Sequence, residues 1–144
     1  MVSKKPTTHI LMVVDMSGSM APLQNDVRGG FNTYLDRLVS EGEKYRVTTT
    51  VFDTRFISLC VDTKLSYAPR LTVDNYRPAG MTALVDAVGK TITEFEAQTK
   101  LAEGDRVLMV VQTDGHENSS REYQTDQVHE MIKDRKTRKD NPWM

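Results

Sequence analysis

Two short runs of consecutive apolar residues constrain the fold of this chain more than any other feature. Residues 10–14 (ILMVV) and 107–111 (VLMVV) have the length of a strand, and no polar residue interrupts either run. A strand that is apolar on both sides must be covered on both faces, which is typical of parallel sheets with helices on each side. An aspartate follows each run, Asp15 directly and Asp114 three positions on. We expect both aspartates at the carboxyl edge of one sheet, where open α/β sheets bind ligands.

The stretches between the two runs predict helices and a hairpin. Apolar residues recur at helical spacing over residues 22–40, and we expect Gly29 and Gly30 to let that helix approach the sheet closely. Residues 46–52 and 56–61 are strand-like and separated by only a short turn, so they must pair as antiparallel neighbours. Two further helices are predicted, one with Thr82 as its N-cap and one that starts near Ser119 or at Thr125.

Length and composition narrow the class of protein. The 144 residues fit one domain, with residues 1–7 expected to form a disordered tail. The formal net charge of -1 gives no electrostatic reason to expect binding to nucleic acid or to a membrane surface. The single cysteine, Cys60, excludes an intramolecular disulfide and a zinc site built from cysteines. We find neither a signal peptide nor a membrane-spanning apolar stretch, and therefore expect a cytoplasmic, intracellular protein.

The first polar turn carries three oxygen-bearing side chains at alternate positions: Asp15, Ser17 and Ser19. Alternate residues of an extended segment point the same way, so these side chains can converge on one point, and Gly18 permits a tight bend. One carboxylate and two hydroxyls, without sulfur or imidazole, suit a hard cation such as Mg²⁺, Mn²⁺ or Ca²⁺. An aspartate or serine before a helix is also an ordinary N-cap, so the turn alone leaves both interpretations open.

Two more oxygen donors are expected at the same edge of the sheet. Thr82 follows a turn that contains Gly80, and Asp114 precedes Gly115 after the second apolar run. Taken alone, Thr82 is more simply interpreted as a helix cap, and Asp114 as part of a turn. Their joint placement with the first turn favours a metal site made of five residues: Asp15, Ser17, Ser19, Thr82 and Asp114.

This set of residues resembles the metal ion-dependent adhesion site of von Willebrand factor type A (vWA) domains. In that family the first loop reads Asp-x-Ser-x-Ser, the second loop contributes a threonine after a glycine-containing turn, and the third contributes an aspartate before a glycine. The resemblance runs from about Thr8 to Lys139. Three phrases look most like small stand-alone bacterial or phage members: Gly30-Phe31-Asn32, Gly80-Met81-Thr82-Ala83-Leu84 and Thr113-Asp114-Gly115.

The resemblance implies a fold and a function. The fold is a Rossmann-like three-layer α/β sandwich whose central sheet is mostly parallel with one antiparallel edge strand. Ser17, Ser19 and Thr82 would bind the metal directly, while Asp15 and Asp114 would act largely through bound waters. Such an ion stays electrophilic and seeks one more anionic oxygen, for instance a carboxylate of a partner protein.

We therefore expect a divalent-metal-dependent protein–protein interaction module that binds an Asp or Glu of a partner and is not an enzyme. The alternative is a structural or assembly component, for example of a phage or a larger complex, in which the metal only stabilises the loops. An aspartyl phosphatase would need a second acid where Ser17 stands. Four neighbours of the site are candidates for a partner-binding rim: Met20, Met81, His116 and Glu117. The last two could instead form an acid/base pair or be ordinary exposed loop residues.

The end of the chain raises a separate expectation. In vWA domains the sheet usually continues with at least one more parallel strand and a closing helix, which this chain apparently lacks because it ends at Trp143 and Met144. Residues 107–111 would then form an edge strand with apolar residues on both faces, which is a hazard for pairing and aggregation. We expect either a truncated domain or a second chain, by self-association or strand addition, that covers this edge.

Overall fold

The computed structural model of the chain describes residues 6–114 and 118–144. Strands and helices alternate along most of the chain, as the apolar pattern predicts. The elements are β1 (Thr8–Asp15), η1 (Gly18–Leu23), α1 (Gln24–Glu41), β2 (Tyr45–Phe52), β3 (Phe56–Lys64), η2 (Leu65–Tyr67), α2 (Leu84–Gln98), β4 (Arg106–Gln112) and α3 (Thr125–Lys136), where η denotes a short 3-10 helix.

The four strands form one mixed sheet in the order β3-β2-β1-β4. Strand β1 lies parallel to both β2 and β4, whereas β2 and β3 form an antiparallel hairpin. The register pairs Asp15 with Phe52 and Val14 with Gln112, so the carboxyl ends of the three parallel strands lie at one edge. The predicted sheet, mostly parallel with one antiparallel edge strand, is confirmed.

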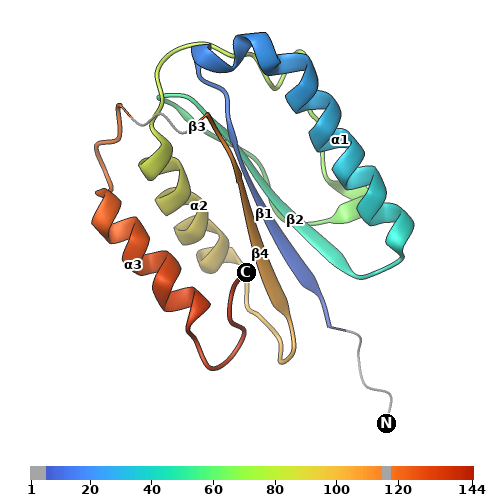
Figure 1. Ribbon diagram of the computed structural model, residues 1–144. Coiled ribbons are helices and arrows are strands. Elements are labelled where there is room, and N and C mark those ends of the chain that lie inside the picture. The colour runs from blue at the N-terminus through green and yellow to red at the C-terminus, as the bar shows by residue number, and fades with distance from the viewer. Residues whose placement is uncertain (1–5, 115–117) are drawn as a thin grey trace.

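Helices cover both faces of this sheet (Figure 1). Helix α1 packs on one face, against the β1 side chains Ile10, Met12 and Val14. Helices α2 and α3 pack on the other face, where Leu11 and Val13 point. Every residue of the first apolar run is therefore buried, at most 4% exposed, because each side of β1 faces its own hydrophobic core. This arrangement explains why the run does not alternate with polar residues.

Two local predictions about helices are wrong. Gly29 and Gly30 lie on the exposed side of α1, where an added Cβ would meet nothing within 4 Å, so they do not bring the helix closer to the sheet. Helix α2 has Ala83 at its N-cap and begins at Leu84. Thr82 therefore precedes the cap, and its side chain belongs to the loop rather than to the helix end.

Hydrogen bonds attach the chain to the sheet one residue before β1 begins. Residues 1–7 are predicted to be a disordered tail, of which 1–5 lie outside the described residues. The N–H of Thr7 donates to Oδ1 of Asp105 over 3.0 Å, and the Thr7 carbonyl accepts the N–H of Arg106 over 2.9 Å. Thr7 is thus attached to the start of β4, which the sequence pattern did not predict.

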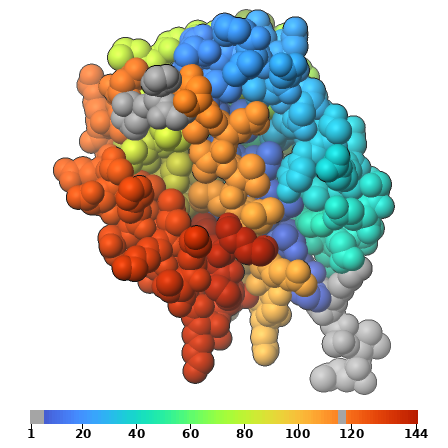
Figure 2. Space-filling view, viewed as in Figure 1, coloured from blue at the N-terminus to red at the C-terminus, as the bar shows by residue number. Residues whose placement is uncertain are grey.

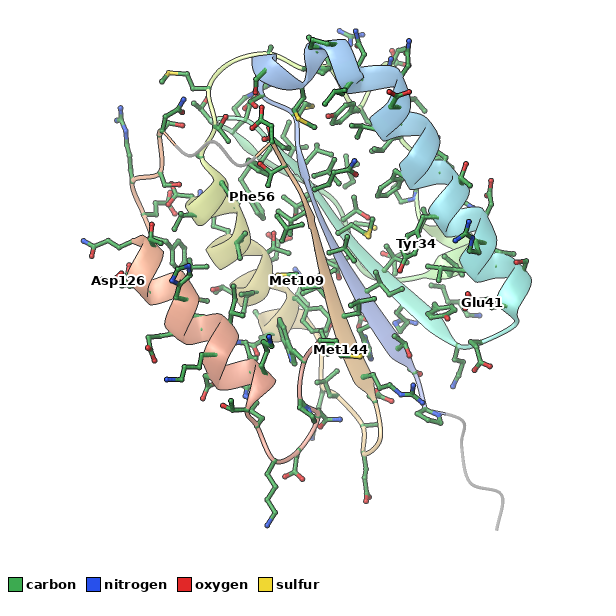
Figure 3. The ribbon with its side chains drawn as sticks, viewed as in Figure 1. Tyr34, Glu41, Phe56, Met109, Asp126 and Met144 are labelled. Carbon is green, nitrogen blue, oxygen red and sulfur yellow. The ribbon has the colours of Figure 1, made fainter. Side chains whose placement is uncertain are left out.

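Strand β4 forms the second edge of the sheet, and the last two residues begin to pair with it. Trp143 forms a parallel bridge with Val107, and backbone hydrogen bonds of 2.8 and 3.0 Å join Met144 to Val107 and Met109. Met109 and Met144 lie side by side at this edge (Figure 3), and the end of the chain covers the lower part of β4 (Figure 2). Val107 is fully buried, whereas Val111 is 40% exposed. The predicted exposed edge is confined to the carboxyl end of β4.

No helix in the described ranges is long and apolar enough to cross a membrane.

Candidate functional site

The carboxyl end of β1 places a fully buried carboxylate at the edge of the sheet. Asp15 is 0% exposed, and its Oδ1 accepts the N–H of Ser17 over 2.8 Å. Its Oδ2 accepts the hydroxyl of Thr113 over 2.9 Å. Asp15 therefore fixes the first turn and joins it to the residues that follow β4.

Oxygen atoms of the first and third loops meet directly above this carboxylate. Oγ of Ser17 lies 3.2 Å from Oγ of Ser19, and the Ser19 hydroxyl donates to Oδ2 of Asp114. Ser17 is 1% exposed, whereas Ser19 and Asp114 are exposed. The cluster thus has a buried side, formed by Asp15 and Ser17, and a side open to solvent.

The loop that carries Thr82 is held against the third loop. Thr82 is 3% exposed, and its N–H donates to Oδ1 of Asn118 over 2.9 Å. Its carbonyl accepts the N–H groups of Asn118 and Ser119 over 3.0 and 3.1 Å. The backbone of Thr82 is therefore bound on both sides by residues that follow Asp114.

The same loop is also held against the first turn, by backbone hydrogen bonds of Gly18 and Ala79. The N–H of Gly18 donates to the carbonyl of Gly80 over 2.9 Å, and the N–H of Ala79 donates to the carbonyl of Met16 over 3.0 Å. Gly80 has a φ of +74°, which side chains rarely adopt, and a Cβ on Gly18 would come within 3.4 Å of the Gly80 carbonyl oxygen. The three loops that carry the five predicted residues thus form one hydrogen-bonded unit.

Comparison with known proteins identifies the fold. The chain is similar to the von Willebrand factor domain of the type V pili tip protein Mfa5 from Porphyromonas gingivalis, with a TM-score of 0.62 and 15% identity over 86% of this chain and 44% of that one. It is also similar to proximal thread matrix protein 1 from the mussel byssus, with a TM-score of 0.62 and 15% identity over 90% of this chain and 34% of that one. The chain has a von Willebrand factor A-like fold.

At this identity the likeness of the vWA-like chain to these proteins extends to the fold alone, and the chain spans less than half the length of either neighbour. No protein-family model matches the sequence, and no curated protein matches it. The identity of the site must therefore be argued from its own geometry.

Of the four residues predicted for a partner-binding rim, the structure describes two, Met81 and Met20. Met81 is 53% exposed beside Thr82, which fits a residue that contacts a partner. Met20 is only 2% exposed, because η1 turns its side chain into the core on the α1 side, so it does not line a rim. His116 and Glu117 lie outside the described residues.

Several residues that shape the site have no clear signal in the sequence. Asn118 binds the backbone of Thr82, yet nothing in its sequence context marks it. The hydroxyl of Tyr76 donates to the backbone carbonyl of Asp15 over 2.6 Å. Burial raises the pKa of Tyr76 to about 12, and the negative charge of Asp15 adds to the effect, so Tyr76 is a neutral donor at physiological pH. These contacts depend on loop conformations that periodicity cannot predict.

The buried carboxylate of Asp86, near the start of α2, attaches the stretch that follows the third loop, residues 118–124, to that helix. It accepts the N–H groups of three consecutive residues, Arg121, Glu122 and Tyr123, over 2.7 to 2.9 Å. Its own N–H donates to the hydroxyl of Ser120. An aspartate in the first turn of a helix is common, so no sequence pattern marks Asp86 as the residue that binds this stretch.

The donor set of the site is unusual for a metal centre. Nowhere in residues 6–114 or 118–144 do three or more His, Cys, Asp or Glu side chains gather in a metal-binding group. The predicted set contains only two carboxylates, Asp15 and Asp114, so a cation here would depend on hydroxyl oxygens. Hard divalent cations accept such neutral oxygen ligands.

Proposed function

We propose that this vWA-like chain is a protein-interaction module that binds a divalent cation, Mg²⁺ or alternatively Mn²⁺ or Ca²⁺, and through it an acidic side chain of a partner protein. The observation that carries the proposal is the convergence of Ser17, Ser19 and Asp114 above the buried Asp15. Adjacent ligands of an octahedral Mg²⁺ ion lie about 3 Å apart, and the two serine hydroxyl oxygens lie 3.2 Å apart. The spacing of the two serine hydroxyl oxygens therefore fits adjacent ligands of one ion.

The hydrogen bonds separate the residues that would orient the metal ligands from those that would bind the ion directly. Both oxygens of Asp15 already accept hydrogen bonds, from the Ser17 N–H and the Thr113 hydroxyl, which suits a residue that orients the ligands rather than one that binds the ion. Asp114 accepts a hydrogen bond from Ser19 and can orient that hydroxyl in the same way. The hydroxyls of Ser17, Ser19 and Thr82 would then hold the ion directly. Removing such an orienting group typically lowers metal affinity 10–100-fold.

The open side of the cluster gives a partner access. Ser19, Asp114 and Met81 are exposed, whereas Asp15, Ser17 and Thr82 are buried. When bound, the ion would supply a concentrated positive charge that attracts a carboxylate oxygen. An Asp or Glu side chain approaching from solvent can therefore complete the coordination, with Met81 beside it. We assign no catalytic residue and propose that the chain is not an enzyme.

A structural or assembly role is the second candidate. One neighbour in fold is a pilus tip protein and the other a thread matrix protein. The carboxyl end of β4 also offers an open edge at Val111, where a second copy or a partner chain can pair. In this case the metal would only stabilise the loops.

The intracellular location expected from the sequence also stays a prediction.

One experiment separates the two candidates. Backbone amide chemical shifts would be followed by NMR while a blocked glycine–serine peptide with one central Asp is added, with Mg²⁺ and then with EDTA. An interaction module binds the peptide only with Mg²⁺, and Ser19→Ala, an exposed and conservative change, abolishes this binding without unfolding the chain. An assembly component shows a lower melting temperature in EDTA and no Mg²⁺-dependent peptide binding. The second result would contradict the proposed function.

A further inference from the structure

A groove with a volume of about 540 Å³ opens beside the candidate metal site. This volume is typical of ligand-binding clefts. Three segments form the groove: the turn between β2 and β3, the first turns of α2, and the stretch that follows the third loop. Phe56, the first residue of β3 and labelled in Figure 3, contributes an aromatic side chain.

The groove begins at the loop that carries Thr82. Met81 and Ala83, which flank Thr82 on both sides, line it. Asn118, whose side chain accepts the Thr82 N–H, lines it as well. A partner segment whose carboxylate reaches the site through the Thr82 loop therefore has its neighbouring residues at the start of this groove.

One face of α2 sets the length of the groove. Ala83, at the N-cap, and the helical residues Asp86, Ala87 and Lys90 line the groove, and their spacing places them along one side of the helix. Seven helical steps of about 1.5 Å give a length of about 10 Å. An extended chain advances about 3.3 Å per residue, so about three residues of a bound segment fit along this face.

Cationic side chains stand along the walls. The guanidinium of Arg55 is held by the buried Asp53, with Nη2 2.8 Å from Oδ2, and Arg55 remains exposed. The ammonium of Lys90 pairs with Glu122 over 3.0 Å and lies 5.6 Å from the centre of the Phe56 ring. The groove thus holds two cations in fixed positions.

Arg121 supplies a third cation, and it is the least compensated. It is exposed, and its guanidinium makes no hydrogen bond or ion pair with another residue in the described part of the chain. The two carboxylates of the lining are already engaged, since Asp86 accepts three backbone N–H groups and Glu122 pairs with Lys90. A ligand in the groove therefore meets a positive charge at Arg121 and the outward side of Arg55, and both carboxylates of the described lining are already engaged.

We propose that the groove binds the partner segment next to the metal-coordinating acid, and that it selects a second Asp or Glu two or three residues from the first. This inference rests on the proposed function, because the first acid defines where the segment enters. The second carboxylate pairs with Arg121, and Arg55 contributes from the opposite wall. The chain would then recognise paired acids in an extended peptide rather than a lone carboxylate.

Blocked glycine–serine peptides of equal length test this inference by NMR titration of the full chain in Mg²⁺. One peptide carries a single Asp, and the others carry a second Asp two or three residues away on either side. We expect at least one two-acid peptide to bind about two- to fivefold more tightly than the one-acid peptide, the range of an exposed ion pair. Arg121→Gln should remove this gain and leave one-acid binding unchanged.

The control is Arg106→Gln, which removes an exposed arginine at the far end of β4 and should keep the gain. If all peptides bind with equal affinity and binding of the one-acid peptide still depends on Mg²⁺, the groove does not select a second acid, and the proposed function stays intact. Loss of the gain in Arg106→Gln also overturns it, because the effect is then one of overall charge. If a two-acid peptide still binds more tightly than the one-acid peptide in EDTA, and Arg121→Gln removes this difference, the groove selects the second acid but the metal site is contradicted.

Discussion

The ring of Tyr123 lies directly against Gly89 in the middle of α2, and a Cβ on this glycine would come within 2.7 Å of ring carbons. The hydroxyl of Tyr123 lies 3.0 Å from the Thr93 hydroxyl, and the backbone N–H of Tyr123 donates to the carboxylate of Asp86. Only a residue without a side chain allows this approach. Tyr123 therefore holds the stretch that follows the third loop close against α2. Helix α2 in turn follows directly on the loop of Thr82.

Gly89→Ala should destabilise the chain by about 1–3 kcal/mol, because the added methyl group must displace the Tyr123 ring. The matched control is Gly29→Ala, since Gly29 is also helical but has nothing within 4 Å of an added Cβ. That change should stabilise the chain by up to about 1 kcal/mol. Unfolding in urea measures both effects, and a Gly89→Ala variant as stable as the wild type would show that Tyr123 does not pack there.

Asp86→Asn should loosen the third loop without unfolding the sheet. The carboxylate accepts three backbone N–H groups, whereas an amide offers a single acceptor oxygen. We expect faster hydrogen exchange of the amides of residues 121–123 and, if the metal site is correct, weaker Mg²⁺ binding. Asp140→Asn, at an exposed position near the end of the chain, serves as the control. Unchanged exchange at residues 121–123 would contradict this account of Asp86.

Asp105 should make the stability of the fold depend on acid pH. Burial alone raises the pKa of this carboxyl, but hydrogen bonds from the N–H groups of Thr7 and Ala102 outweigh burial and lower it below its usual value. The ring of His9, 3.2 Å away, acts in the same direction. Since the folded pKa lies below the unfolded one, Asp105 contributes stability above the unfolded pKa of about 4, and this contribution is lost as the pH falls through the folded pKa.

Asp105→Asn should therefore cost about 1–3 kcal/mol at neutral pH, because a buried hydrogen-bonded charge is lost. The difference from the wild type should begin to shrink below about pH 4, where the carboxyl becomes protonated in the unfolded chain, and should be lost as the pH falls through the lower pKa of the folded state. Free energies of unfolding measured between pH 3 and pH 7 test both points. A cost that stays constant over this range would exclude the carboxylate as its source.

The open edge at the carboxyl end of β4 should cause self-association. Val111 is 40% exposed on an edge strand, beyond the part of β4 that Trp143 and Met144 cover. Sedimentation velocity should show association that increases with concentration, and Val111→Lys should reduce it because a charge opposes edge pairing. A compact monomer at all concentrations would remove this expectation.

Patterns in the sequence predicted the layout of the fold well, because burial on two faces leaves a direct trace in composition. The runs at residues 10–14 and 107–111 correctly indicated two adjacent parallel strands, β1 and β4, and the edge at which Asp15 and Asp114 lie. Short spacing alone required the antiparallel β2–β3 pair, which the register confirms. These features depend on local periodicity and on chain length, both of which a sequence displays.

Contacts between distant segments could not be predicted in the same way. The apolar stripe of Val27, Phe31 and Leu35 in fact places Gly29 on the opposite side of α1. No pattern indicated that η1 would turn Met20 into the core. The hydrogen bonds of Asn118 to Thr82 depend on the path of a loop, not on a pattern. Convergence of the first and third loops was predicted because each follows a strand of known direction.

Direct titration with Mn²⁺, followed by electron paramagnetic resonance, tests the central claim that Asp15, Ser17, Ser19, Thr82 and Asp114 form a site for one divalent ion. We expect a single Mn²⁺ site that Mg²⁺ displaces, with affinity reduced about 10–100-fold in Asp114→Ala and unchanged in Asp140→Ala. Absence of a saturable site in the wild type, or equal affinities of wild type and Asp114→Ala, would contradict it.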